Sequence, residues 1–224
     1  MAYVPSSKKE ADFLANFDGL IYQNPALAAD TALFAVDGEL LKILLIQRGG
    51  YPYKGCWALP GGFVDIDEDI ANAAKRELKE ETGIDVPYVE QAAVWGKPER
   101  DPRQRVVTVS FVAIAWLGSA KAKAGDDAAQ AEWFAISGYS KRVGKTETRI
   151  SYVLDGAEEI SAQVNYPNER IQEIVCESGG GLAFDHAESI AVSIELLKRR
   201  ADEIAGLSLH KEKAAHAAKL IYNL

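Results

Sequence analysis

The sequence predicts a fold that combines one β-sheet with several helices, either α+β or a mixed-sheet α/β sandwich. Two pairs of apolar segments are each joined by Asp-Gly, at residues 37–38 and 155–156, as in β-hairpins. Apolar residues recur at helical spacing over residues 70–82, 185–205 and 210–222. Hairpins and helices in one chain of this length favour one main domain.

The first hairpin is predicted from two apolar runs, residues 28–36 and 39–47. Asp37 and Gly38 between them indicate a type I′ turn, because both central residues of that turn need a positive φ. A loop rich in glycine, proline and tyrosine follows and leads into Trp57-Ala58-Leu59-Pro60-Gly61-Gly62.

The clearest helix begins after the acidic residues 67–69, which supply hydrogen-bond acceptors and negative charge to its first turn. Its apolar stripe consists of Ile70, Ala73, Ala74 and Leu78. Gly83 is the expected stop, since glycine readily adopts the left-handed conformation that ends many helices.

The remaining strands are predicted at residues 86–94, 106–117, 132–136 and in the second hairpin, residues 146–166. A charged turn at 97–105 separates the first two of these. A glycine-rich hinge at 179–181 precedes the two C-terminal helices.

Composition and charge exclude several classes of protein. With 48% hydrophobic and 26% charged residues the composition is that of an ordinary soluble globular protein. A net charge of −8 argues against nucleic-acid binding by a broad basic surface, and an anionic substrate would need metal ions and a few placed arginines. Cys56 and Cys176 lie far apart and without metal-ligand spacing, which predicts reduced thiols in a cytoplasmic protein. The polar residues 1–12 do not form a signal peptide, and no apolar run predicts a membrane span.

Three glutamates of the first clear helix are predicted to project from one face. Glu77, Glu80 and Glu81 are spaced i, i+3 and i+4. Their repulsion would raise their pKa values unless positive charge lies among them. One explanation is a solvated acidic face, softened by Arg76 and nearby lysines.

The segment before this helix favours a metal site instead. Leu59-Pro60-Gly61-Gly62 brings backbone without bulky side chains to the start of the helix, where a carbonyl can face a cation. Carboxylates and a backbone carbonyl are hard oxygen ligands that suit Mg²⁺, with Mn²⁺ as an alternative. Such ions would bind a diphosphate and activate water for attack on phosphorus.

The same residues resemble the Nudix box. Gly62, five residues, Glu68, seven residues and then Arg-Glu-Leu-Lys-Glu-Glu-Thr-Gly-Ile at 76–84 match that motif at every specified position. The resemblance implies an α/β/α sandwich with a mixed sheet. It also implies that Arg76 orients the catalytic glutamates and that Glu68 is a supporting acid. The implied metal ligands are the Gly61 carbonyl and the carboxylates of Glu77, Glu80 and Glu81.

Segments outside the box resemble one branch of that family. They are Leu-Ile-Gln-Arg at 45–48, residues 57–62, Arg-Asp-Pro-Arg at 100–103 and Leu-Ala-Phe-Asp-His at 182–186. This branch contains Nudix domains fused to nicotinamide mononucleotide adenylyltransferase and Nudix-related transcriptional regulators. Its enzymes favour ADP-ribose, so the resemblance implies cleavage of ADP-ribose to AMP and ribose 5-phosphate. A homodimer is implied as well.

The resemblance also predicts a domain division. Residues 1–24 form an N-terminal extension, residues 25–200 the Nudix hydrolase domain and residues 201–224 a C-terminal helix. Residues 137–181, which hold the second hairpin, depart from the branch and are predicted to be an insertion. Such an insertion would shape either the substrate pocket or a dimer contact.

The predicted substrate-binding residues are Arg48, Arg100, Arg103 and Gly62. A planar guanidinium matches phosphate oxygens in bidentate fashion, although an arginine here can instead pair with a neighbouring acid. Trp57 is expected in the core, whereas Tyr51, Tyr53 and Trp95 are open candidates for stacking an adenine.

The general base has several candidates. Asp126, Asp127 and Glu132 lie in a suitable loop region, and a glutamate of the box is the alternative. Asp185 and His186 are expected to have structural roles, with Asp185 capping a helix. Phe184 is expected to pack on the sheet or across a dimer.

Two other functions compete with ADP-ribose hydrolysis. A ligand-sensing transcriptional regulator would need a winged-helix domain after residues 182–186, for which little sequence follows, so no specific DNA binding is expected. A nucleoside triphosphate pyrophosphatase is the other alternative, because the box indicates the reaction and not the base or sugar.

Overall fold

The computed structural model describes residues 3–17, 24–116, 128–168, 170–205 and 211–224. Its strands are β1 (Ala26–Asp37), β2 (Leu40–Arg48), β3 (Trp57–Ala58), β4 (Gly61–Phe63), β5 (Glu90–Trp95), β6 (Val106–Trp116), β7 (Ala128–Val143), β8 (Glu147–Asp155), β9 (Glu159–Pro167) and β10 (Val175–Ser178). Its helices are α1 (Lys8–Ala15), α2 (Ile70–Thr82), α3 (His186–Ala205) and α4 (Lys211–Tyr222), with a 3-10 turn η2 (Ile171–Glu173).

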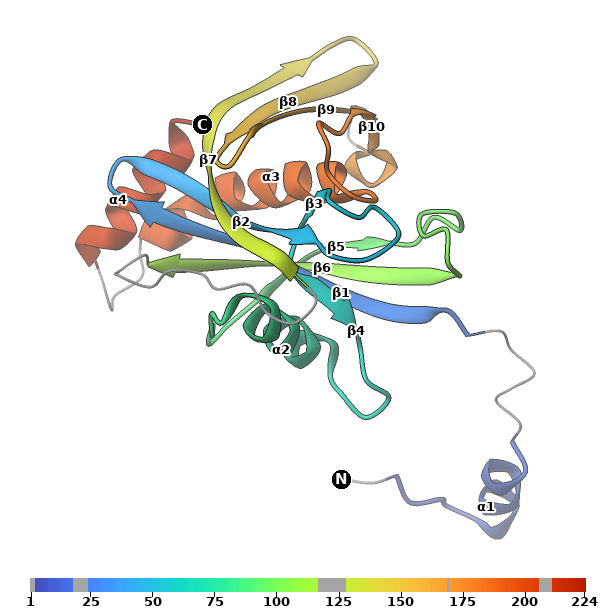
Figure 1. Ribbon diagram of the computed structural model, residues 1–224. Coiled ribbons are helices and arrows are strands. Elements are labelled where there is room, and N and C mark those ends of the chain that lie inside the picture. The colour runs from blue at the N-terminus through green and yellow to red at the C-terminus, as the bar shows by residue number, and fades with distance from the viewer. Residues whose placement is uncertain (1–2, 18–23, 117–127, 169, 206–210) are drawn as a thin grey trace.

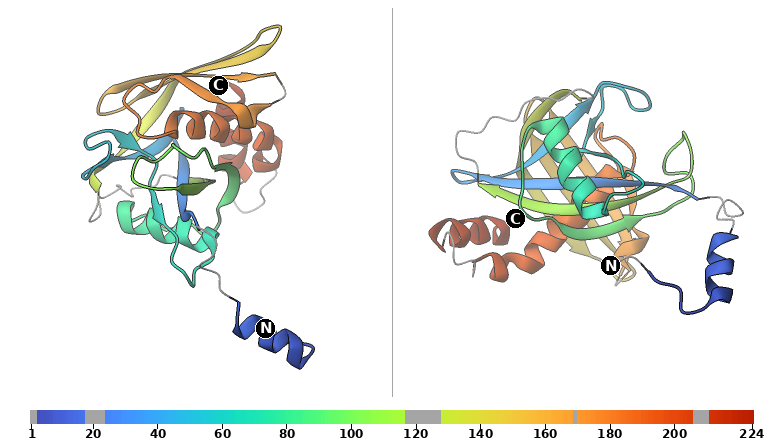
Figure 2. Two further views of the ribbon diagram at one scale, coloured as in Figure 1. Left: turned by 90° about the vertical axis from the view of Figure 1, so that its right-hand side faces the viewer. Right: turned by 90° about the horizontal axis from the view of Figure 1, so that it is seen from below.

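One mixed sheet organises the described residues. The strand order is β10-β9-β8-β7-β2-β1-β6-β5, and β3 and β4 pair with β2 and β1 beside this path. Strands β1 and β6 run parallel, whereas their other neighbours are antiparallel. Helix α2 covers one face, while α3 and α4 lie on the other, under the curved strands β7 to β10 (Figures 1 and 2). The predicted mixed-sheet α/β/α sandwich is therefore confirmed.

The first hairpin forms, but its turn differs from the predicted one. Asp37 pairs with Leu40, so the turn residues are Gly38 and Glu39. Gly38 has a φ of 58°, and Glu39 is not among the residues with a positive φ. This is the pattern of a type II′ turn with glycine at the first central position, so the type I′ prediction is wrong.

Helix α2 begins and ends as its sequence predicts. The Asp69 side chain accepts a hydrogen bond from the Ala71 N–H, and Gly83 ends the helix in the left-handed conformation with a φ of 72°. Ala73, Ala74 and Leu78 are buried against strands of the sheet. The polar face of the same helix therefore carries the glutamates toward the opposite side.

Two strands differ from their predicted bounds. Strand β5 begins at Glu90 and not at residue 86, because Pro87 lacks an N–H for a sheet ladder; Val86 and Val89 are instead buried near α2. Strand β7 has 16 residues and extends far beyond the predicted segment 132–136. It is long because it pairs first with β2 and then with β8.

The second hairpin is confirmed and extends the sheet. Asp155 pairs with Glu159 across the turn, and β9 pairs in turn with β10, a strand that the sequence did not predict. Tyr152 and Leu154 of β8 are buried in the same core cluster as α3 and α4. Residues of the predicted insertion thus build part of the main core.

The helical predictions near the C-terminus are confirmed by α3 and α4. Helix α1 was not predicted, has no buried residue and lies apart from the sheet (Figure 1). Among the described residues, no helix is long and apolar enough to cross a membrane.

Candidate active site

Arg76 lies at the centre of the acidic cluster on α2. Its Nε and Nη2 donate to Glu68 at 3.0 and 2.8 Å, and its Nη1 donates to Glu77 at 2.7 Å and to Glu80 at 3.1 Å. Nη2 also donates to the Phe63 carbonyl at 3.1 Å, which ties α2 to β4. Arg76 therefore supplies the positive charge that carboxylates this close together need.

The acids around Arg76 respond differently to their surroundings. Hydrogen bonds from Arg76 lower the pKa of Glu68. Burial raises the pKa of Glu77, and this effect outweighs the hydrogen bond and positive charge of Arg76. The hydrogen bonds from Glu68 and Glu77 raise the pKa of Arg76 itself, so the guanidinium stays charged. Further positive charge near Glu77 would therefore favour its ionised form.

The backbone of β4 lies directly against the acidic cluster. The Gly61 N–H donates to Oε2 of Glu81 at 2.8 Å. A Cβ at Gly62 would come within 2.6 Å of the Glu77 carboxyl group, and one at Gly61 within 2.4 Å of the Asp30 side chain and the Ala29 carbonyl. Only glycine at both positions allows this close approach.

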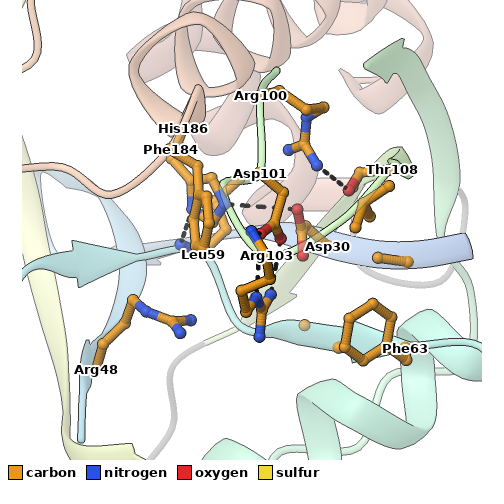
Figure 3. Close-up of a pocket in the computed structure, with 14 residues that line it drawn as sticks. Asp30, Arg48, Leu59, Phe63, Arg100, Asp101, Arg103, Thr108, Phe184 and His186 are labelled. Carbon is orange, nitrogen blue, oxygen red and sulfur yellow. Dashed lines mark hydrogen bonds and ion pairs between the residues drawn. The ribbon is translucent and has the colours of Figure 1, made fainter. Parts of the chain in front are cut away.

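Two adjoining cavities open at this point. One, of about 480 Å³, is lined by Gly61, Gly62, Arg76, Glu77, Glu81, Arg48 and Arg103, among others. The other is lined by Asp30, Arg48, Arg100, Asp101, Arg103, Phe184 and His186, among others (Figure 3). Arg48 and Arg103 belong to both linings. The structure thus brings together most of the predicted site residues, whereas Glu80 lines neither cavity and its side chain is 59% exposed.

Arg48 and Arg103 flank the boundary between the two cavities. Nε of Arg48 donates to the Pro52 carbonyl at 2.9 Å, and its guanidinium lies 5.0 Å from the ring centre of Phe184. Burial and the charge of Arg103 lower the pKa of Arg48. Arg103 donates to both carboxylate oxygens of Asp101, at 3.0 and 2.8 Å. Arg103 is therefore paired with a neighbouring acid, which was the alternative to phosphate binding that the sequence left open.

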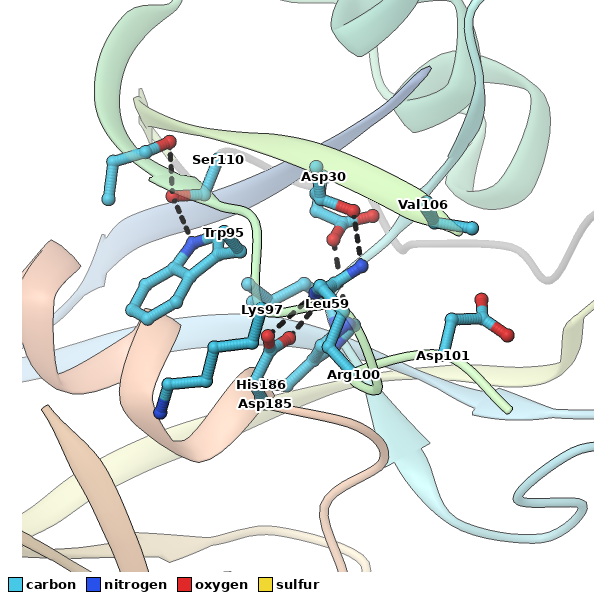
Figure 4. Close-up of polar contacts among 12 residues, drawn as sticks. Asp30, Leu59, Trp95, Lys97, Arg100, Asp101, Val106, Ser110, Asp185 and His186 are labelled. Atoms are coloured by element: carbon cyan, nitrogen blue, oxygen red, sulfur yellow. Dashed lines mark hydrogen bonds and ion pairs between the residues drawn. The ribbon is translucent and has the colours of Figure 1, made fainter. Parts of the chain in front are cut away.

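Arg100 is held more tightly than its two neighbours. Its side chain is 5% exposed and donates to the Thr108 hydroxyl (Figure 3) and to both oxygens of Asp185 (Figure 4). The carboxylate of Asp185, the residue directly before α3, takes part in this ion pair, so its structural role includes fixing Arg100. Arg100 keeps one wall of the cavity in place.

Asp30 and His186 form a contact that the sequence did not reveal. Nδ1 of His186 accepts a hydrogen bond from the Leu59 N–H at 2.8 Å, which places the ring proton on Nε2. Nε2 lies 3.5 Å from Oδ2 of Asp30. His186 thereby holds the chain two residues before Gly61 (Figures 3 and 4). The available signal was Asp30 itself, an acid in the interior of a largely apolar strand.

The other candidates have diverse positions. Trp57 is 1% exposed and lies in the core, as predicted. Phe184 packs beside the sheet and also lines the cavity. Glu132 is exposed on β7, and Asp126 and Asp127 lie outside the described residues. The general base therefore stays an open prediction.

The donor atoms at the acidic end suit a divalent cation. Glu77, Glu81 and the backbone of Gly61 offer hard oxygen ligands in one cavity, which is the chemistry that Mg²⁺ prefers. Within the described part of the chain, no three His, Cys, Asp or Glu side chains gather closely enough to hold an ion by themselves. The carboxylates of Glu77 and Glu80 share Nη1 of Arg76 instead.

Comparison with known proteins gives consistent results. The model of the NUDIX domain family matches residues 25–155. The ADPR responsive transcriptional repressor NtrR of Acinetobacter baylyi is 50% identical over 107 residues, which cover 47% of this chain and 43% of that protein. An ADP-ribose pyrophosphatase of Methanocaldococcus jannaschii is 43% identical over 122 residues, which cover 54% of this chain and 68% of that protein. The match thus spans less than half of the repressor.

Two solved structures resemble the whole fold. A MutT/nudix family protein from Enterococcus faecalis superposes with a TM-score of 0.64 at 27% identity, covering 97% of this chain and 88% of that chain. The NUDIX domain of Shewanella oneidensis NrtR complexed with ADP ribose superposes with a TM-score of 0.58 at 28% identity, covering 84% of this chain and 98% of that chain.

Proposed function

The chain belongs to the NUDIX family, and from this premise we propose that it hydrolyses the pyrophosphate bond of ADP-ribose, giving AMP and ribose 5-phosphate. One observation carries the proposal: Glu77, Glu81 and the Gly61-Gly62 backbone line the same cavity as Arg48 and Arg103. Acidic ligands for a cation and arginines for a phosphate are the two components that such a reaction needs.

Each part of the site has a proposed task. Arg48 and Arg103 bind the diphosphate. Gly62 has no side chain, so the backbone beside Glu77 leaves room for the diphosphate. Arg76 positions Glu77 and Glu80 through its hydrogen bonds, and Glu81 is fixed by the Gly61 N–H. A divalent cation held by Gly61, Glu77, Glu80 and Glu81 would neutralise phosphate charge and lower the pKa of a water molecule. Mg²⁺ is the proposed ion, with Mn²⁺ as the alternative.

Arg100 keeps a more limited role in this proposal. Asp185 and Thr108 occupy three of its five N–H groups. The remaining N–H groups are available to a phosphate, while the ion pair holds the guanidinium plane in a fixed orientation.

The proposal is tested by product analysis with Mg²⁺ and a panel of ADP-ribose, NADH, ADP-glucose, diadenosine polyphosphates and nucleoside triphosphates. Release of AMP from ADP-ribose, lost in Glu81→Gln and kept in Glu212→Gln, is the expected result. Glu212 is the matched control, because it is an exposed glutamate on α4. Preferred turnover of a nucleoside triphosphate would identify the alternative pyrophosphatase function, and no turnover by folded protein would refute hydrolysis.

A second function has one observation in its favour, the 50% identity to a repressor described as ADPR responsive. Such a regulator would sense ADP-ribose with the same cavity and bind DNA with another element. Helix α4 buries Ala214, Ala217 and Ile221 on its apolar face, so only its polar face could contact DNA. Sequence-specific retardation of DNA that is reversed by ADP-ribose would support the regulator. We also propose a homodimer, which light scattering of the purified protein would test.

A further inference from the structure

A third cavity adjoins the arginine-lined one on the side away from the glutamates. It has a volume of about 500 Å³, and Tyr53, Trp95, Arg100, Phe184 and Glu188 are among its lining residues. Arg100 and Phe184 line both this cavity and its neighbour. The cavity with Glu77 and Glu81 shares neither of these two residues. The three cavities therefore follow one another in the order acidic, basic, aromatic.

Three aromatic side chains give the third cavity flat surfaces. The rings of Tyr53 and Phe184 lie 4.6 Å apart, centre to centre, with an angle of 56° between their planes. The Trp95 indole N–H donates to the Ser110 hydroxyl at 3.0 Å, which fixes the plane of its ring (Figure 4). Arg100, fixed by Asp185, closes the cavity toward the basic side. Such rings suit a planar ligand that stacks.

The backbone at two of these aromatics is unusual. Tyr53 and Phe184 have φ values of 60° and 49°, and within the described residues no other residue except glycine has a positive φ. Bulky residues seldom adopt this conformation. Where they do, the surrounding structure imposes it, and such residues cluster at binding sites. The two rings contact each other, and Tyr53 lines the aromatic cavity while Phe184 lines both it and the basic cavity.

Glu188 gives the same cavity an unmet hydrogen-bonding requirement. The residue is 7% exposed, and its Oε1 accepts a hydrogen bond from the Cys176 N–H at 3.1 Å. Its Oε2 is buried and has no hydrogen-bond partner among the described residues. Burial, with the charge of Asp185 as a smaller effect, raises the pKa of Glu188. A buried polar atom without a partner is costly, so a ligand that supplies an N–H group would be favoured.

We propose that this aromatic cavity binds a purine that carries an amino group, as adenine does, with Glu188 accepting a hydrogen bond from that group. The proposal rests on the proposed function, because a diphosphate in the basic cavity would direct its nucleoside toward the aromatic one. The purine ring would stack on the aromatic side chains. The terminal torsion of a glutamate is soft, so Oε2 can turn toward the base by a small rotation that keeps Oε1 within hydrogen-bonding distance of the Cys176 N–H.

The fixed position of Oε1 allows a sharp test with Glu188→Gln. The Cys176 N–H needs an acceptor, so the amide oxygen of the glutamine takes the place of Oε1. The amide NH₂ then replaces Oε2, which changes an acceptor into a donor. An NH₂ group opposes the amino group of adenine and matches the oxygen that hypoxanthine carries at the same position. The preference for the base should therefore reverse.

The experiment measures the affinities of AMP, IMP and ribose 5-phosphate by titration calorimetry. For the unchanged protein we expect AMP to bind roughly ten-fold more tightly than IMP, the effect of one hydrogen bond to a charged group. Glu188→Gln should bind IMP at least as tightly as AMP. Glu212→Gln, which removes the same charge from an exposed position on α4 outside the cavity, should keep the preference for AMP.

Stacking is tested separately, which also covers the case that Glu188→Gln does not fold. Trp95→Leu and Tyr53→Leu should each weaken AMP and IMP binding roughly ten-fold and leave ribose 5-phosphate binding unchanged. Equal affinities for AMP and IMP in the unchanged protein, together with no effect of these variants, would overturn the base site. ADP-ribose hydrolysis without any base preference refutes this inference alone, whereas the reversal without hydrolysis refutes only the proposed function.

Discussion

Replacing Gly62 by alanine tests whether the position of the Glu77 carboxyl group matters for turnover. The new Cβ would lie 2.6 Å from that group, whereas ordinary contact begins at 3.4 Å, so the carboxyl group must retreat by about 0.8 Å. A displacement of this size in an active site costs about 10²-fold in rate. We therefore expect kcat for ADP-ribose to fall about 100-fold. The free energy of unfolding should change by less than about 1 kcal/mol, because the end of a flexible side chain can move aside.

Gly96→Ala is the matched control, since a Cβ at Gly96 would meet nothing within 4 Å. AMP release measures the rate, and urea denaturation measures the stability of the same preparations. Gly96→Ala should keep full activity. Gly62→Ala with unchanged kcat and unchanged stability would show that turnover does not depend on where Glu77 lies. A large loss of stability in Gly62→Ala would instead refute the assumption that Glu77 can move.

Three further predictions concern stability and metal dependence. Asp185→Ala leaves the buried guanidinium of Arg100 without its carboxylate and should lower the free energy of unfolding by about 3 kcal/mol in urea titrations; an unchanged midpoint would contradict a buried pair. Because the pKa of Glu188 is raised, the folded protein holds this proton more tightly than the unfolded chain does. The resulting stabilisation is complete below the ordinary pKa of 4.5 and is lost as the pH rises through the raised pKa. Urea titrations should therefore show the unchanged protein losing stability relative to Glu188→Gln as the pH rises above 4.5, and parallel curves would refute a raised pKa. Chelation should abolish ADP-ribose hydrolysis and Mg²⁺ should restore it, so activity that survives chelation would exclude the metal site. Adding Mg²⁺ should raise the Tm of the unchanged protein, and this rise should be smaller for Glu81→Gln.

The features of the fold that the sequence predicted correctly depend on local signals. Helix α2 is defined by Asp69 at its start, an apolar stripe and Gly83 at its end, all within one short segment. Both hairpins depend on glycine-containing turns between apolar runs. The turn type of the first hairpin was missed because the register between β1 and β2, and not the dipeptide alone, decides which residues are central.

The features that were missed depend on partners far away in the chain. The length of β7 follows from pairing with β2 at one end and β8 at the other, and neither partner can be read from residues 132–136. Strand β10 is exposed and lacks an apolar pattern, so its pairing with β9 leaves little trace in the sequence. Long-range pairing is set by the packed core, which overrides local propensity.

The same distinction applies to the candidate site. The glutamates and Arg76 share one helix, so their spacing alone predicted that they would lie together. The contacts of Asp30 with His186 and of Arg100 with Asp185 join separate elements and could not be derived from spacing. The motif Leu-Ala-Phe-Asp-His drew attention to Asp185 and His186, but it did not show which residues they contact. Only the folded chain shows that these residues position one wall and one loop of the cavity.

Pairing of the arginines also changes the charge that a substrate would meet. Asp101 neutralises Arg103 and Asp185 neutralises Arg100, whereas Arg48 donates to a backbone carbonyl. Of the three predicted phosphate-binding arginines, Arg48 alone thus has no carboxylate as its hydrogen-bond partner among the described contacts.

A diphosphate carries more negative charge than one arginine can balance, and Glu77 and Glu81 add to it in the same cavity. The proposed binding of ADP-ribose would therefore require cations to provide the balance. On this reasoning, chelation removes binding of ADP-ribose and not turnover alone, whereas AMP, with no diphosphate to place beside the glutamates, should lose less affinity. Calorimetry with and without Mg²⁺ measures both, and equal losses for the two ligands would refute the charge argument.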